Sequence, residues 1–215
     1  MTSVGTGWAS SAAPHHAQSV FRRLLPLAGF PEVPKTSADE GGGQHATVLD
    51  ICCSYGITAA LLNHHVTLEE LYDRYTSPQI ASLTTTELIE SDRKYYAARR
   101  RPDAALVIGL DIAAPAIAYG RAAGLLDEGF AENLETAPPS PALYRATRGT
   151  RLITVTGGAS FLTARTFGPL LDGRREPPWV AAFVLRTGPY QNISDGLALL
   201  SMTTEKEGVE IGRRR

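Results

Sequence analysis

The sequence predicts an α/β fold with a doubly wound, mostly parallel sheet. Short apolar runs of strand length recur along the chain, and most are followed by a turn and then by apolar residues at helical spacing. Twice an acid, Asp50 or Asp111, stands between the strand and the helix. Because strands that alternate with helices need right-handed crossover connections, we expect the strands to run parallel.

Length and composition indicate one domain and a small-molecule partner. The 215 residues are 43% hydrophobic, which suits a single core, placed here at residues 14–215 after a flexible tail at 1–13. The 21 basic and 22 acidic side chains nearly cancel, so no net field draws the protein to nucleic acid or to an anionic membrane. Because the sequence shows neither a signal peptide nor an apolar run of roughly 20 residues, we expect a cytoplasmic, soluble protein. The sequence leaves open whether it forms a homodimer.

The first half of the chain predicts a lead-in helix, a buried strand and a helical insertion. The lead-in helix covers residues 15–28, and the strand covers 47–51. After the turn at 52–56 a helix begins, and residues 63–103 form an insertion with two helices that could serve as a lid. Each of these helices starts with a capping box, Thr67 with Glu70 and Thr84 with Glu87.

The second half predicts four more strands and a closing unit. The strands are expected at residues 104–110, 129–134, 152–155 and 179–185. From Ile193 onward the apolar residues suit a closing antiparallel hairpin, although a short helix over residues 194–200 fits them as well.

The strand-end turns should line one crevice, because ligands of parallel α/β sheets bind at the carboxyl ends of the strands. Asp111 is suited to accept hydrogen bonds from two ribose hydroxyls, since an ionised carboxylate is an acceptor only. The alternative is that Asp111 is the N-cap of the helix that starts at Ala113 or Ala114.

The segment DICCSYG at 50–56 resembles the first motif of the class I S-adenosylmethionine-dependent methyltransferases. In that motif an acid ends the first strand, and small residues occupy three alternate positions after it. Here those positions hold Cys52, Ser54 and Gly56. The resemblance extends over residues 46–190 and implies a Rossmann-like sheet of about seven strands, with the methyl donor across the first two loops. It implies that the cofactor is bound by Asp50, Cys52, Ser54, Tyr55, Gly56, Asp111, Ile112, Glu132, Asn133, Thr156 and Gly157.

The resemblance assigns these residues separate tasks. Asp111 takes the place of the ribose-binding acid, Glu132 and Asn133 take that of a polar pair at adenine, and Thr156 follows the fourth strand. The family commonly has glycine where this chain has Cys52 and Ser54, and the Ser54 hydroxyl could bind the methionine carboxylate.

The function expected from this resemblance is methyl transfer from S-adenosylmethionine to a small-molecule acceptor, such as one of secondary metabolism. No catalytic residue is evident. One alternative is a protein of the same fold and cofactor that catalyses another reaction or serves as a non-catalytic partner subunit. A nicotinamide-dependent reductase is the other, although the G-x-G-x-x-G spacing is absent.

Several further residues have two interpretations. Tyr55 must point into the cleft or under the next helix. The pair Cys52 and Cys53 lacks the spacing and partners of a metal or redox site, so packing is expected. His64 and His65 suit a solvated helix end or, for one of them, a general base. Tyr190 could position substrate or end a turn, and the arginine runs 99–101 and 213–215 are interpreted as solvated.

Overall fold

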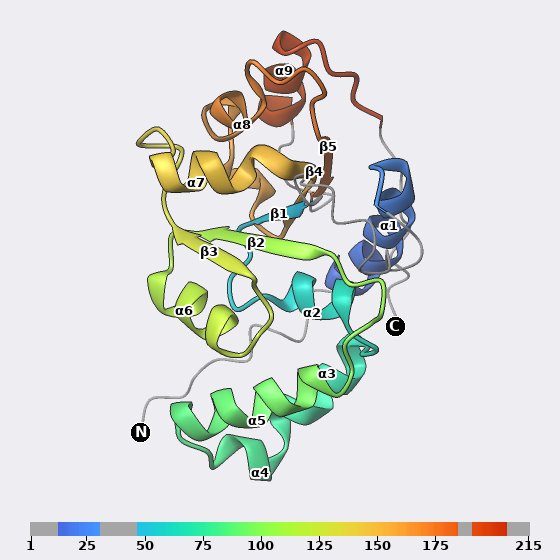
Figure 1. Ribbon diagram of the computed structural model, residues 1–215, viewed down its shortest axis with the longest axis vertical. Helices are drawn as coiled ribbons and strands as arrows, with labels where there is room; N and C mark the ends of the chain where they lie inside the picture. Colours follow the sequence, from blue (N-terminus) through green and yellow to red (C-terminus); the bar gives the residue numbers. More distant parts are fainter. Residues whose placement is uncertain (1–12, 31–46, 185–190, 206–215) are drawn as a thin grey trace, which may run out of the picture.

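The computed structural model describes residues 13–30, 47–184 and 191–205, which form an α/β layered fold (Figure 1). Within them a sheet of five parallel strands has the order β3-β2-β1-β4-β5. Its strands are β1 (Thr47–Ile51), β2 (Leu106–Asp111), β3 (Glu128–Ala131), β4 (Thr150–Thr156) and β5 (Trp179–Phe183). From β1 the chain adds β2 and β3 on one side of β1, and it then crosses over to add β4 and β5 on the other side. The strand order therefore reverses between β1 and β4, which is the topological switch point of the sheet.

The predicted parallel α/β sheet is confirmed, but the strand count of about seven and the closing hairpin are wrong for the described residues. The residues after Ile193 continue a helix, α9 (Gln191–Leu199), which was the alternative. Helix is favoured because Ile193, Gly196 and Leu197 recur at helical spacing and are buried on one face. Tyr190 and residues 206–215 lie outside the described part, as does the predicted tail up to residue 12.

Helices cover both faces of the sheet (Figure 1). One face packs on α1 (Ala13–Leu27), α2 (Ile57–Asn63) and α6 (Ala114–Ala122), and its core contains Val48, Val107, Leu152, Phe21, Leu62 and Ile117. The other face packs on α7 (Pro141–Ala146), α8 (Ala164–Leu171) and α9, and its core contains Leu49, Ile108, Ile153, Leu143, Phe167 and Ile193. The strands are apolar on both faces because both are covered.

The helical insertion contains three helices rather than the two predicted. These are α3 (Leu68–Thr76), α4 (Pro78–Ala81) and α5 (Thr85–Ala97), and both predicted capping boxes are present. The short α4 starts at Ser77 and Pro78, an N-cap and first-turn signal that the sequence contains. The insertion packs against α2 and α6 through a third core cluster, and its role as a lid stays a prediction.

The insertion leaves and rejoins the domain at one point. His64 pairs with Arg100 in an antiparallel bridge, the His65 N–H donates to Arg99 O over 2.8 Å, and the Arg101 N–H donates to Asn63 O over 2.8 Å. These bonds close the base of the insertion just before β2. None of the described helices is both long enough and apolar enough to cross a membrane.

Candidate functional site

The loops after β1, β2 and β4 meet at the carboxyl end of the sheet. The Cys52 N–H donates to Leu110 O at the end of β2, at 2.8 Å. On the other side, a side chain on Gly158 would lie within 2.6 Å of Cys52 Cβ, so the loop after β4 can approach only because this residue is glycine. The predicted convergence of the strand-end turns is present for these three loops.

The first loop has a left-handed backbone at every second residue. The φ angles are +57° at Cys52, +50° at Ser54 and +88° at Gly56. L-residues adopt this region at a cost of roughly 1–2 kcal/mol each, and a glycine does not bear that cost. The three positions are the ones at which the methyltransferase motif has its small residues. The chain therefore keeps this loop conformation although two of the three residues carry a β-carbon.

Asp111 holds the first loop in place. Its Oδ2 accepts from the Ser54 N–H and its Oδ1 accepts from the Ala113 N–H, both at 2.9 Å. The N-cap interpretation is wrong, because α6 begins after Ala113 and no side chain caps it. Each carboxylate oxygen has a second lone-pair site, so Asp111 can still accept two further hydrogen bonds.

Asp50 is a buried carboxyl group with an unused acceptor. It is 1% exposed, and its Oδ1 accepts from Thr154 Oγ1 at 2.8 Å. Its Oδ2 has no partner among the described residues, and neither has the buried Thr156 Oγ1. Burial raises the pKa of Asp50 to about 7, the charge of Asp111 adds to this, and the Thr154 hydrogen bond opposes it.

These unpaired atoms lie on the two strands that flank the switch point, β1 and β4. A buried polar atom without a partner costs about 1–3 kcal/mol. Such atoms at the carboxyl end of a parallel sheet suit a ligand with polar groups of its own.

Three apolar side chains remain exposed on the loops at the carboxyl end of the sheet. Tyr55, Ile112 and Phe161 follow β1, β2 and β4 and are 45%, 72% and 76% exposed. The Tyr55 ring packs edge-on against Tyr119 of α6, with centroids 5.5 Å apart. Of its two predicted positions, in the cleft or under the next helix, the ring therefore takes up the second only in part. Phe161 was not predicted as a site residue, although a lone aromatic in a turn after a strand is a readable signal.

Glu132 and Asn133 are bonded within their own loop after β3. Glu132 accepts from the N–H and the hydroxyl of Ser140, at 2.8 and 2.6 Å, and thereby holds the start of α7. Asn133 Oδ1 accepts from the Glu135 N–H at 3.0 Å, and Asn133 is exposed. Their contact with adenine stays a prediction.

The cysteines lie in apolar surroundings. Burial raises the pKa of both thiols, that of Cys52 to about 11, so they stay protonated near neutral pH. Cys53 is buried beside Gly109 of β2, where a β-carbon would lie 2.9 Å from its Sγ. This supports the packing interpretation. In residues 13–30, 47–184 and 191–205, no group of three or more His, Cys, Asp or Glu side chains could hold a metal ion.

Of the two histidines, only His64 differs from the solvated helix end that was predicted. His64 is buried, its Nδ1 lies 3.1 Å from Ala60 O, and its ring lies against Tyr96. Burial lowers its pKa, so it is a neutral core residue at pH 7. His65 is exposed, as expected.

Comparison with known protein families, with curated proteins and with solved structures finds no match to this chain. A proposal for its function therefore depends on the residues and the geometry described above.

Proposed function

We propose that this protein is an S-adenosylmethionine-dependent methyltransferase that acts on a small-molecule acceptor. The observation that carries the proposal is the first loop, with left-handed residues at 52, 54 and 56 and its Ser54 N–H bonded to Asp111. This is the backbone for which the resembled motif uses small residues. The Rossmann-like strand order of the described sheet supports the same conclusion.

The residues present fit such a cofactor. Asp111 has acceptor sites left for two ribose hydroxyls, and Ile112 offers an apolar surface next to it for adenine. The exposed Ser54 hydroxyl suits a carboxylate. Tyr55 is placed where an aromatic face could attract a sulfonium cation.

The bound cofactor would supply an already activated methyl group. The work left to the protein is to orient the acceptor and to exclude water, which can account for a large share of a rate enhancement. The exposed Phe161 beside the crevice suits an acceptor with an apolar part.

The test is ligand binding by the full chain and by Asp111→Asn. S-adenosylmethionine and S-adenosylhomocysteine should raise the melting temperature of the wild type, because a ligand that binds only the folded state stabilises it, whereas NADH should not. Asp111→Asn should weaken S-adenosylhomocysteine binding roughly tenfold or more in calorimetry, since charge-assisted hydrogen bonds are lost. The matched control is Asp172→Asn, an exposed acid at the end of α8.

Two outcomes would contradict the proposal. Wild-type affinity in Asp111→Asn would remove the site assignment, and stabilisation by NADH alone would favour a reductase. Mass spectrometry that found the cofactor unchanged beside a transformed substrate would favour a different reaction on the same fold.

A further inference from the structure

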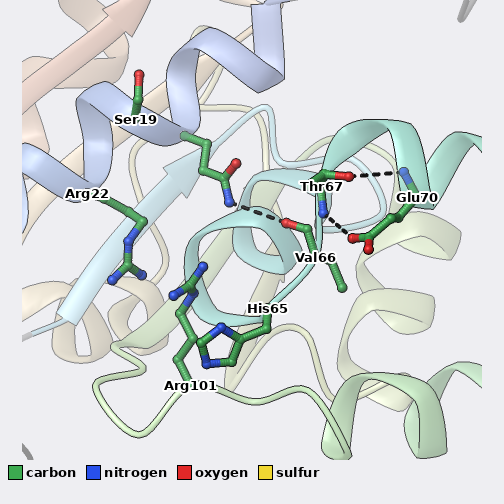
Figure 2. Close-up of a pocket in the computed structure, with 8 residues that line it drawn as sticks. Ser19, Arg22, His65, Val66, Thr67, Glu70 and Arg101 are labelled. Atoms are coloured by element: carbon green, nitrogen blue, oxygen red, sulfur yellow. Dashed lines mark hydrogen bonds between the residues drawn. The ribbon is translucent and has the colours of Figure 1, made fainter.

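A cavity of about 530 Å³ lies at the end of the sheet opposite the crevice. It is formed where α1 meets the end of α2, the start of α3 and the segment before β2. Its lining comprises Gln18, Ser19, Arg22, His65, Val66, Thr67, Glu70 and Arg101 (Figure 2). None of these residues belongs to the loops that would hold the methyl donor.

Hydrogen bonds within the protein hold the side chains of both arginines of the cavity. Arg22 Nη1 donates to Leu62 O at 2.8 Å, and its Nη2 donates to Asp103 at 2.8 Å. Arg101 Nε donates to His64 O at 3.1 Å. Both side chains are thus oriented before any ligand arrives, which reduces the entropy lost on binding.

The lining contains two arginines and one glutamate, and Asp103 beside it forms an ion pair with Arg22. Figure 2 shows the guanidinium groups of Arg22 and Arg101 extending toward one another, with His65 beside Arg101. Partial burial lowers the pKa of Arg101, the charge of Arg22 lowers it further, and Asp103 opposes both. Asp103 balances the charge of Arg22, so Arg101 is the cation that an anionic ligand would pair with.

The two carboxylates at the cavity are each bonded to a residue of its lining. Asp103 forms its ion pair with Arg22. Glu70 accepts from the Thr67 N–H at 2.8 Å in the capping box, on the other side of the cavity (Figure 2). Among the described residues, no acid forms an ion pair with Arg101.

We propose that this cavity binds a phosphate monoester, with the phosphate between Arg22, Arg101 and His65. Guanidinium groups suit the planar, multiple hydrogen bonding of phosphate oxygens, and Arg101 forms no ion pair with an acid among the described residues. The cavity falls within the range of about 300–1,000 Å³ of small-molecule sites and exceeds the needs of a phosphate ion. Gln18 Nε2 donates to Leu61 O and Thr67 Oγ1 accepts from the Glu70 N–H, which leaves Gln18 Oε1 and the Thr67 hydroxyl proton for a hydroxylated organic part.

The test is calorimetric titration of the full chain with ribose 5-phosphate, inorganic phosphate and ribose. Ribose 5-phosphate should bind saturably and more tightly than inorganic phosphate, ribose should not bind, and affinity should fall as salt screens the charges. Arg101→Gln should weaken ribose 5-phosphate binding roughly tenfold or more. Arg100→Gln removes the same charge from an exposed neighbour outside the lining and should bind like the wild type.

The proposal is overturned if ribose 5-phosphate does not bind saturably, or if inorganic phosphate binds equally well. Equal affinities of Arg101→Gln and Arg100→Gln would overturn it too. Should Arg101→Gln fail to fold, the exposed His65→Gln variant replaces it, with a smaller loss expected. Asp111→Asn should keep wild-type affinity for ribose 5-phosphate, so failure of the methyl-donor site and failure of this site are distinguishable.

Discussion

Two buried aspartates, Asp50 beside the crevice and Asp92 in α5, are partnered very differently. Asp92 is 0% exposed, and its Oδ1 accepts from Arg74 Nε at 3.1 Å and Nη2 at 2.7 Å. Its Oδ2 accepts from the hydroxyls of Tyr75 at 2.6 Å and Tyr119 at 2.5 Å. Asp50 has a single partner, on one oxygen.

The difference separates an acid with both oxygens partnered from one with an unpartnered oxygen. The Asp92 cluster joins α3 and α5 of the insertion to α6, and the chain itself supplies hydrogen-bond donors to both carboxylate oxygens. It also reaches the crevice, because Tyr119 packs against Tyr55 of the first loop. Asp50 leaves an acceptor unused at the place where ligands of such sheets bind, and a buried acid of this kind is a candidate for function.

The largest effect is expected when Asp92 loses its charge. Asp92→Asn should lower the free energy of unfolding by roughly 3 kcal/mol, because Arg74 is left as a partly buried cation without its counter-charge. Urea denaturation at pH 7 measures this. Glu90→Gln, which removes an exposed ion pair with Lys94 on the same helix, is the control and should leave the midpoint unchanged. A small effect of Asp92→Asn would show that the cluster is not what holds the insertion.

A smaller effect, visible as pH dependence, is expected at Asp50. Its folded pKa of about 7 lies above the value of 3.8 for the unfolded chain, so the folded state binds the extra proton. Its contribution to stability is complete below about pH 4 and is lost as the pH rises through 7, a change on the order of 3–4 kcal/mol.

The measurement is the free energy of unfolding of wild type and Asp50→Asn from pH 4 to pH 8. The wild type should lose free energy of unfolding relative to Asp50→Asn as the pH rises through 7. The contribution of His64 is the same in both proteins and cancels in this difference. Parallel curves would mean that Asp50 is not a protonated buried acid at acidic pH.

The smallest effect is expected at Ser54, which is exposed and has a φ of +50°. Ser54→Gly should raise the free energy of unfolding by about 0.5–1 kcal/mol relative to Ser54→Ala, because glycine adopts the left-handed region without a steric penalty. Both variants keep the N–H that bonds to Asp111 and lose the hydroxyl, so they should lose the same amount of cofactor affinity. Equal stability of the two variants would contradict the strain assigned to this loop.

Much of the local structure was determined by the sequence itself. The strand at 47–51 was predicted with its observed bounds, and the capping boxes at Thr67 and Thr84 form as written. Periodicity and caps depend on residues within a few positions of each other, which is why they can be read from the chain. The same holds for the acids at the strand ends, Asp50 and Asp111.

Other features were decided only by the tertiary structure. Asp50 finds its one partner 104 residues away in β4, and Arg22 of α1 comes to lie beside Arg101 only because the base of the insertion is closed. His64 is buried by Tyr96, which lies beyond two intervening helices. The absence of a closing hairpin from the described residues belongs here too, since the apolar pattern after Ile193 suits a strand or a helix and packing on α8 favours the helix. Each of these outcomes depends on contacts between segments far apart in the chain, which local periodicity does not encode.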